Sequence, residues 1–317
     1  MNKKIAVIGA GAWGTALAVL QAKAGRSVTL WARDPIKADF MQSSRTNPHL
    51  PNVALPPSLR VTSAMPEADS LLIAVPLQTL RRLLPALPPS VPLVLCCKGV
   101  EQTTLALPPE IVAPRECAIL TGPNFAHEVA AGLPAAAILA TPDAALRSKL
   151  VANLHTPCFR LYGAADIVGA ALGGAAKNVI AIAAGVVMGA GLGENARAAL
   201  ITRGLAEIAR LAEALGGRAE TVAGLSGLGD LLLTCTGMSS RNYSLGYGLG
   251  QGQSLQQILA ARDTVTEGVM TAPALLARAR MSGVDMPITQ AVTNLLDGGM
   301  TVSQTMAALM GRALKDE

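Results

Sequence analysis

Three glycines near the amino terminus constrain the fold more than any other feature of this sequence. Gly9, Gly11 and Gly14 form GAGAWG, directly after the apolar run 4–8 and at the start of an apolar-faced helical segment, 13–24. In this setting the first glycine permits a tight turn, the second lets backbone approach a pyrophosphate, and the third allows close helix-to-strand packing. The N–H groups at the start of a helix favour phosphate. The pattern predicts a dinucleotide-binding turn, and the alternative is a tight turn without a ligand.

Further short apolar runs predict a sheet covered on both faces. They alternate with helical segments and are bounded by turn residues, at 27–31, 71–75, 92–97, 118–120 and 135–141. Strands that are apolar throughout are typical of parallel sheets buried between helices. We therefore expect an α/β fold whose N-terminal domain is a Rossmann-type, doubly wound parallel sheet.

The pattern changes after about Tyr162. From Asp166 onward the strand signals stop, and residues 195–215 repeat Leu, Ile and Ala at helical spacing with Arg and Glu opposite. Further helical patterns lie at 255–261, 271–282 and 302–313. We place the boundary between Leu161 and Asp166. Residues 1–164 are then the dinucleotide-binding domain, and residues 165–317 are an all-helical domain for substrate binding and catalysis.

Composition and charge exclude several classes of partner. Aromatic residues make up only 3% and the basic residues are scattered, so nucleic acid is not expected as a partner. The most apolar stretch, 178–193, is shorter than a membrane span and lies between Lys177 and Glu194. The early glycines interrupt what would otherwise resemble a signal peptide. We expect a cytoplasmic protein without membrane insertion, and its apolar helical domain is compatible with a homodimer.

The sequence also offers no metal site. The five cysteines show no CxxC spacing, which indicates buried thiols. His127 and Glu128 begin an HExxH-like pattern, but Ala131 stands where the second histidine would be.

The end of the second predicted strand bears on the choice of nicotinamide cofactor. Enzymes that use NAD usually carry an acid there for the ribose hydroxyls, but this sequence has Trp31, with Arg33 two residues on. An arginine can pair with the 2′-phosphate of NADPH. If the strand ended later than predicted, Asp34 would take the place of the acid and favour NADH. Alternatively, Arg33 and Asp34 are a solvated pair of turn residues. NADPH is therefore the expected cofactor, with NADH as a second donor.

Two lysines are candidate catalytic groups. Lys177 lies in an apolar helical pattern, and burial lowers the pKa of a lysine and suits it to protonate an alkoxide. The alternative interpretation is that the aliphatic part of Lys177 covers apolar surface while its ammonium reaches water. Lys98 follows an apolar strand, and it is therefore expected at the sheet edge where doubly wound folds bind ligands. The alternative is an exposed lysine with no role in binding.

Two polar segments could hold a substrate. Residues 121–124 (TGPN) follow a predicted strand at the ligand-binding edge of the sheet. Ser240, Arg241 and Asn242 have the chemistry of a phosphate clamp, since arginine offers a planar fork of donors. A plain polar loop is the alternative for this second segment.

Seven segments together resemble bacterial NAD(P)H-dependent glycerol-3-phosphate dehydrogenase over nearly the whole chain. They are VIGAGAWGTALA, CKGVE, LTGPNFAHEVAAGLPAA, LGGAAKNVIAIAAGV, NARAALITRGLAEI, GLSGLGDLLLTCTGMSSRN and VTEG. The resemblance implies that Lys177 is the catalytic acid/base, that Lys98 assists at the carbonyl, and that Asp230 belongs to the active site. It implies a substrate set of Lys98, Gly122, Asn124, Lys177, Asp230, Ser240, Arg241 and Asn242.

The same resemblance implies a cofactor set of Gly9, Gly11, Ala12, Trp13, Gly14, Arg33, Lys98, Ala126, Arg241, Val265 and Glu267. The family often has serine or threonine at the positions of Ala12, Cys97 and Asn124. A few side-chain hydrogen bonds of the family are therefore expected to differ in this chain.

The expected reaction is reduction of dihydroxyacetone phosphate to sn-glycerol 3-phosphate, which the family uses for phospholipid synthesis. One alternative is a two-domain reductase of a keto acid, which needs a carboxylate clamp and no substrate phosphate. The other is a non-catalytic NADPH-binding regulator, which would tolerate loss of Lys177.

Overall fold

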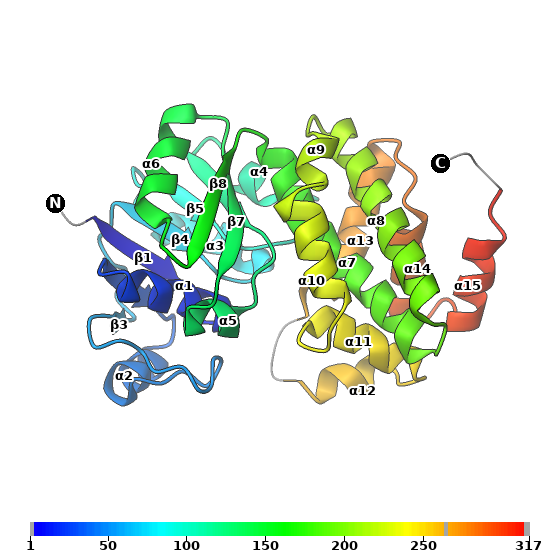
Figure 1. The fold of residues 1–317 in the computed structure, drawn as a ribbon, viewed down its shortest axis with the longest axis horizontal. Helices are drawn as coiled ribbons and strands as arrows, with labels where there is room; N and C mark the ends of the chain where they lie inside the picture. The colour runs from blue at the N-terminus through cyan, green and yellow to red at the C-terminus, as the bar shows by residue number, and fades with distance from the viewer. Residues whose placement is uncertain (1–2, 263–265, 314–317) are drawn as a thin grey trace. The chain divides into compact units, whose positions relative to one another are not determined.

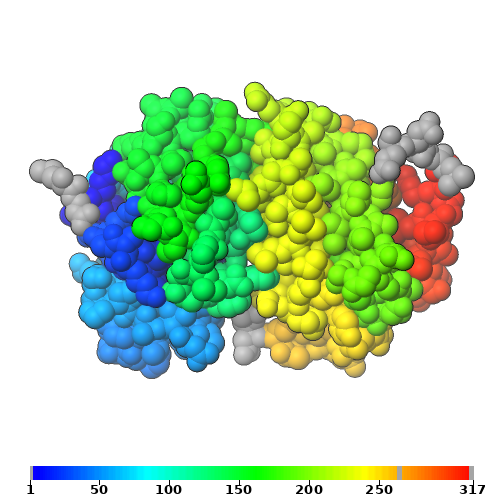
Figure 2. All heavy atoms as spheres, viewed as in Figure 1, coloured from blue at the N-terminus to red at the C-terminus, as the bar shows by residue number. Residues whose placement is uncertain are grey.

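The computed structural model describes residues 3–262 and 266–313, and the chain divides into two compact units (Figures 1 and 2). The first unit comprises residues 1–98 and 106–171, and the second comprises residues 99–105 and 172–317. The short segment 99–105 thus belongs with the C-terminal part of the chain although it follows the fifth strand.

The first unit is built on one eight-stranded sheet (Figure 1). Its strand order is β3-β2-β1-β4-β5-β6-β7-β8, and the first six strands run parallel in the order of a dinucleotide-binding fold. This confirms the predicted α/β class and Rossmann-type sheet. The strands are β1 (Lys4–Ile8), β2 (Ser27–Trp31), β3 (Arg60–Thr62), β4 (Ser70–Ile73), β5 (Leu93–Leu95), β6 (Cys117–Thr121), β7 (Ala135–Ala140) and β8 (Phe159–Ala164).

The sheet departs from the predicted parallel arrangement at β7. This strand pairs antiparallel with β6, and β8 then runs parallel to β7. The only helix between β6 and β7 is α5 (Ala126–Ala131), whose six residues span about 9 Å, whereas a five-residue strand spans about 17 Å. Because α5 is too short to return the chain to the other edge, β7 starts where β6 ends.

Helices cover both faces of the sheet. They are α1 (Ala12–Lys23), α2 (Pro35–Ser44), α3 (Leu80–Leu83), α4 (Pro108–Val112), α5 and α6 (Ala144–Leu154). Along β1, Ile5 and Val7 pack in a cluster with α1, α2, α5 and α6, while Ala6 and Ile8 are equally buried on the opposite face. Both faces are therefore dry, which explains why the inner strands are apolar at every position.

The second unit is helical. Its helices are α7 (Ile167–Gly189), α8 (Glu194–Ala214), α9 (Ala219–Val222), α10 (Asp230–Cys235), α11 (Arg241–Gly250), α12 (Leu255–Ala260), α13 (Glu267–Met281), α14 (Pro287–Leu296) and α15 (Val302–Met310), with the start of α7 still in the first unit. By length and composition α7 could cross a membrane, but 89% of its apolar window is buried. It is the core helix of this unit.

Close backbone contact fixes α7 against α11. A Cβ at Gly246 would lie 1.9 Å from the carbonyl oxygen of Ile182, and one at Gly185 would lie 2.1 Å from that of Tyr243. Only glycine fits at such distances, so the two helices have one register. That register sets Lys177 on α7 relative to the first turn of α11.

Glu207 on α8 is a buried carboxylate with a structural role. It accepts the backbone N–H groups of Ile288 (2.6 Å) and Thr289 (3.3 Å) at the start of α14, where a negative charge suits the helix dipole. Burial nevertheless raises the pKa of this carboxyl from 4.5 to about 7, and the two N–H bonds and Arg210 oppose the rise. The folded protein therefore holds a proton here that the unfolded chain releases near pH 4.5.

We expect this proton to make stability fall as the pH rises from 5 to 8. In that range the folded state binds more protons than the unfolded state, so stability decreases by up to about 3 kcal/mol until the pH passes about 7. Urea unfolding of wild type and Glu207→Gln at four pH values measures the difference. The exposed Glu213→Gln on the same helix is the control and should keep the wild-type slope. Parallel profiles for wild type and Glu207→Gln would contradict the assignment.

Candidate functional site

The three glycines of the first turn leave space on one side only. A Cβ at Gly9, whose φ is +112°, would lie 2.6 Å from the carbonyl oxygen of Ala74, and one at Gly14 would lie 1.9 Å from that of Gly9. At Gly11, by contrast, no heavy atom of the described chain lies within 4 Å of the Cβ position. The backbone is therefore closely packed at Gly9 and Gly14 and open at Gly11, which leaves space for a pyrophosphate beside Gly11.

The start of α1 lies directly after this turn. Ala12 and Trp13 are its first residues, and the N-cap, Gly11, has no side chain to occupy the first N–H groups. The indole Nε1 of Trp13 is buried and has no hydrogen-bond partner among the described residues. These donors are available to a phosphate or another polar part of a ligand.

The end of β2 offers an arginine rather than an acid. Trp31 is the last residue of the strand, and its Nε1 donates to the carbonyl of Ser63 at 2.8 Å. Arg33 is exposed. Asp34 caps α2, because its Oδ1 accepts the N–H groups of Ile36 (3.0 Å) and Lys37 (3.4 Å). The carboxylate of Asp34, which the sequence left as a possible ligand of the cofactor ribose, is therefore occupied in capping α2.

Further predicted residues follow the carboxyl ends of β5 and β6. Lys98 lies three residues after β5 and is half-buried, and Gly122 follows β6 with a φ of +153°. Asn124 donates to the carbonyl of Ala136 at 3.3 Å, while its Oδ1 is buried without a partner in the described chain. Ala126 is the first residue of α5. Since β1, β5 and β6 are parallel, these residues lie at the same sheet edge as the glycine turn.

In the helical unit, Lys177 meets a buried carboxylate. Its side chain is buried on α7, and Nζ donates to the carboxylate of Asp230 and, at 3.0 Å, to Oγ1 of Thr234. Asp230 is fully buried at the start of α10, after the wide turn Leu225–Gly229. The sequence pointed to Lys177 and Asp230 but not to Thr234. The i, i+4 spacing of Asp230 and Thr234 on one helix was the available signal.

The structure gives Ser240, Arg241 and Asn242 three different surroundings. Ser240 caps α11 by accepting the N–H of Tyr243 at 3.2 Å, and Arg241 is the exposed first residue of that helix. Asn242 is buried, where its Nδ2 donates to Oδ1 of Asn178 (2.9 Å) and its Oδ1 accepts the N–H of Gly268 (2.9 Å). Asn242 thus links α11 to α7 and to the start of α13.

Glu267 is the first residue of α13, next to Gly268. Val265 lies outside the described residues.

Arg262 is a cation that the sequence did not single out. Its guanidinium donates to the carbonyl of Arg241 (2.8 Å) and to Oγ of Ser244 (3.0 Å). Burial lowers its pKa, and the positive charge of Arg241 lowers it further. Two guanidinium groups therefore lie near the start of α11, which favours an anion there. No motif joins these arginines, which lie 21 residues apart in the sequence.

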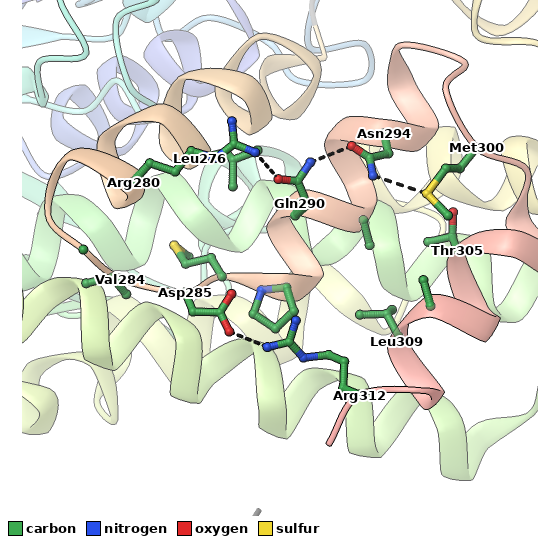
Figure 3. Close-up of a pocket in the computed structure, with 15 residues that line it drawn as sticks. Leu276, Arg280, Val284, Asp285, Gln290, Asn294, Met300, Thr305, Leu309 and Arg312 are labelled. Carbon is green, nitrogen blue, oxygen red and sulfur yellow. Dashed lines mark hydrogen bonds and ion pairs between the residues drawn. The ribbon is translucent and has the colours of Figure 1, made fainter. Parts of the chain in front are cut away.

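The cavity in Figure 3 is separate from all these residues. It has a volume of about 420 Å³, lies among α13, α14 and α15, and none of the predicted site residues lines it. Asp285 and Arg312 form an ion pair on its wall, and Gln290 donates to Asn294 at 2.6 Å. Most of its polar side chains bond to one another, and the cavity is not part of the candidate site.

The charged side chains of the helical unit could supply proton donation and anion binding. A lysine ammonium held in a nearly dry environment by a carboxylate and a hydroxyl has a fixed position and a proton to give. The two arginines of α11 and its flank could hold a phosphate. In the described chain, no group of three or more His, Cys, Asp or Glu side chains could hold a metal.

Comparisons with known proteins give one consistent family. The model of the NAD-dependent glycerol-3-phosphate dehydrogenase N-terminus matches residues 4–147, and that of its C-terminus matches residues 166–307. A glycerol-3-phosphate dehydrogenase [NAD(P)+] of Acidiphilium cryptum is 61% identical, over 100% of this chain and 99% of the relative. That of Gluconobacter oxydans is 55% identical over 97% of each.

A solved structure agrees with these relatives. The crystal structure of glycerol-3-phosphate dehydrogenase from Coxiella burnetii is 36% identical, with a TM-score of 0.92, over 98% of this chain and 99% of that one.

Proposed function

The chain belongs to the NAD-dependent glycerol-3-phosphate dehydrogenase family, and from this premise we propose that it reduces dihydroxyacetone phosphate with NADPH. The product, sn-glycerol 3-phosphate, would supply phospholipid synthesis in the cytoplasm. The observation that carries the proposal is the buried Lys177, held by Asp230 and Thr234. Burying a lysine and a carboxylate costs desolvation free energy, which favours a role for this pair in the chemistry.

The helical residues supply the proton chemistry. The nicotinamide, when bound, supplies a hydride for the C2 carbonyl carbon. Lys177 donates a proton from Nζ to the C2 oxygen, and Asp230 keeps the ammonium in place until then. Lys98 assists at the same oxygen. Residues 1–164 thus form the dinucleotide-binding domain, and residues 165–317 form the domain for substrate binding and proton transfer.

The phosphate of the substrate is held by charge and by neutral donors. Arg241 binds it with its planar fork, and Arg262 adds positive charge nearby. The full substrate set is Lys98, Gly122, Asn124, Lys177, Asp230, Ser240, Arg241 and Asn242.

The cofactor is held by the glycine turn and the sheet edge. The open face at Gly11 and the first N–H groups of α1 suit the pyrophosphate. The proposed set is Gly9, Gly11, Ala12, Trp13, Gly14, Arg33, Lys98, Ala126, Arg241, Val265 and Glu267. We also propose a homodimer, because the helical unit exposes Met281 and Met310, and light scattering in solution would test it.

The preference for NADPH rests on Arg33. Its side chain is exposed after β2, which ends in Trp31 rather than in an acid, and the carboxylate of the neighbouring Asp34 caps α2. We expect Arg33→Ala to raise the KM for NADPH at least about tenfold, since a charge-assisted hydrogen bond is worth about 1.5–3 kcal/mol. The KM for NADH should stay unchanged. Lys37→Ala, which removes an exposed charge from α2, is the control. Equal effects on both cofactors would exclude a 2′-phosphate contact.

Oxidation of NADPH, followed at 340 nm, tests the function as a whole. Dihydroxyacetone phosphate is compared with unphosphorylated dihydroxyacetone, pyruvate and ketopantoate. Turnover confined to the phosphorylated ketone is the expected result. Turnover of a keto acid would favour a reductase of that class, and NADPH binding without turnover would favour a regulator.

A further inference from the structure

Asn47 has a buried side chain on the segment that follows α2, and its contacts reach the glycine turn. It is 2% exposed. Its Nδ2 donates to the carbonyl of Ala10 at 2.9 Å and to Oγ1 of Thr15 at 2.6 Å. Its Oδ1 accepts the N–H of His49 at 3.0 Å. Both amide protons and the amide oxygen are therefore used, and two of the three bonds end on the turn and the first turn of α1.

The bond to Ala10 fixes the direction of the next N–H group. The Ala10–Gly11 peptide is planar and trans, so the carbonyl of Ala10 and the N–H of Gly11 point in opposite directions. Because Asn47 holds that carbonyl on the buried side, the N–H of Gly11 points to the other side. That is the side where the Cβ position of Gly11 meets no heavy atom of the described chain.

The second bond ties the same amide to the helix. Thr15 is fully buried, and its backbone N–H donates to the carbonyl of Gly11 at 2.9 Å. The side chain of Asn47 therefore joins Ala10, the residue before Gly11, to Thr15, whose N–H donates the first helical hydrogen bond to the Gly11 carbonyl. A turn held at both ends does not have to be ordered when the ligand binds.

We propose that Asn47 is a positioning residue for the dinucleotide: it pre-orients the Gly11 N–H toward the pyrophosphate without touching the cofactor. The proposal rests on the proposed placement of the pyrophosphate at the glycine turn. If it is correct, replacing Asn47 changes the affinity for the dinucleotide, whereas the rate of the chemical step and the KM for the phosphorylated ketone stay unchanged.

The test compares two variants with a matched control. Asn47→Ala removes both donors, and Asn47→Asp keeps the shape and the acceptor for His49 but places an oxygen against the carbonyl of Ala10. Gln42→Ala is the control. The side chain of Gln42 is also an amide, it accepts the backbone N–H of Val61 at 2.8 Å, and among the described residues it makes no hydrogen bond to the turn. The Kd for NADPH is measured by its fluorescence, and kcat and both KM values by the 340 nm assay.

We expect the Kd and KM for NADPH to rise about tenfold in Asn47→Ala and more in Asn47→Asp. At saturating NADPH, kcat and the KM for dihydroxyacetone phosphate should stay within about twofold of wild type. The proposal is overturned if both folded Asn47 variants bind NADPH like Gln42→Ala, or if kcat and both KM values change together. If Asn47→Ala does not fold, Asn47→Asp decides alone.

Gly11→Val separates this proposal from the one on which it rests. The φ of Gly11 is −75°, which any residue adopts, so a valine there fills the open face without backbone strain. Loss of NADPH binding in Gly11→Val supports the site, and normal Asn47 variants would then refute the positioning role alone. NADPH binding that survives in Gly11→Val would refute the pyrophosphate site itself.

Discussion

Lys177→Met lowers kcat with dihydroxyacetone phosphate by at least about 10³-fold while NADPH binds as in wild type. General acid catalysis by a positioned side chain contributes about 10²–10⁴-fold, and methionine keeps the length of the chain without a proton to give. Lys177 is 9% exposed and its ammonium is held by Asp230 and Thr234, so solvent water has little access to replace it. Steady-state rates at 340 nm and NADPH fluorescence measure the two quantities.

Two controls make this result specific. Removing Lys177 leaves the buried Asp230 without its cation, which costs about 3–5 kcal/mol, so Lys177→Met is also made together with Asp230→Asn. The double variant should be as inactive and more stable. Lys149→Met, an exposed lysine on α6, should keep full activity. A double variant that folds, binds NADPH and retains a tenth of wild-type kcat would exclude Lys177 as the acid.

The order of the sheet shows what a strand pattern can and cannot predict. The inner strands were recognisable because both of their faces are buried, as at Ala6 and Val7 of β1. The edge strand β8 was missed because buried Phe159 alternates with exposed Arg160. The reversal at β7 depends on the length of α5 relative to a strand, which no hydrophobic pattern records. Local apolar runs therefore predict that a strand exists more readily than they predict its direction.

The site followed a similar rule. The glycine turn was predictable because strand, turn and helix are contiguous, and Lys177 stood out as one charge in an apolar helix. Its contact with Asp230 joins residues 53 positions apart, and the carbonyl of Ala10 is held from position 47. Such contacts depend on how helices and loops pack, so they were visible only in the structure. The Asn242 amide is an example, since its neighbours in sequence gave no sign that Asn178 and Gly268 would occupy it.

Arg241→Met is expected to lower kcat/KM for dihydroxyacetone phosphate by about 10³-fold. A bidentate arginine–phosphate contact comprises two charge-assisted hydrogen bonds of about 1.5–3 kcal/mol each, and about 1.4 kcal/mol corresponds to a factor of ten. Ser240 would still cap α11 through the N–H of Tyr243, so the helix itself should persist. The variant and wild type are compared with both phosphorylated and unphosphorylated dihydroxyacetone.

The unphosphorylated ketone distinguishes a phosphate contact from a general defect. If Arg241 binds only the phosphate, its loss should leave the slow turnover of dihydroxyacetone nearly unchanged, because that substrate makes no such contact. Arg210→Met, an exposed arginine of the same unit that bonds the carbonyl of Asp285, should behave as wild type with both substrates. An equal loss with both ketones would mean that Arg241 acts through the cofactor or supports the site around Lys177. Phosphate recognition would then have to come from Lys98, Arg262 or the neutral donors.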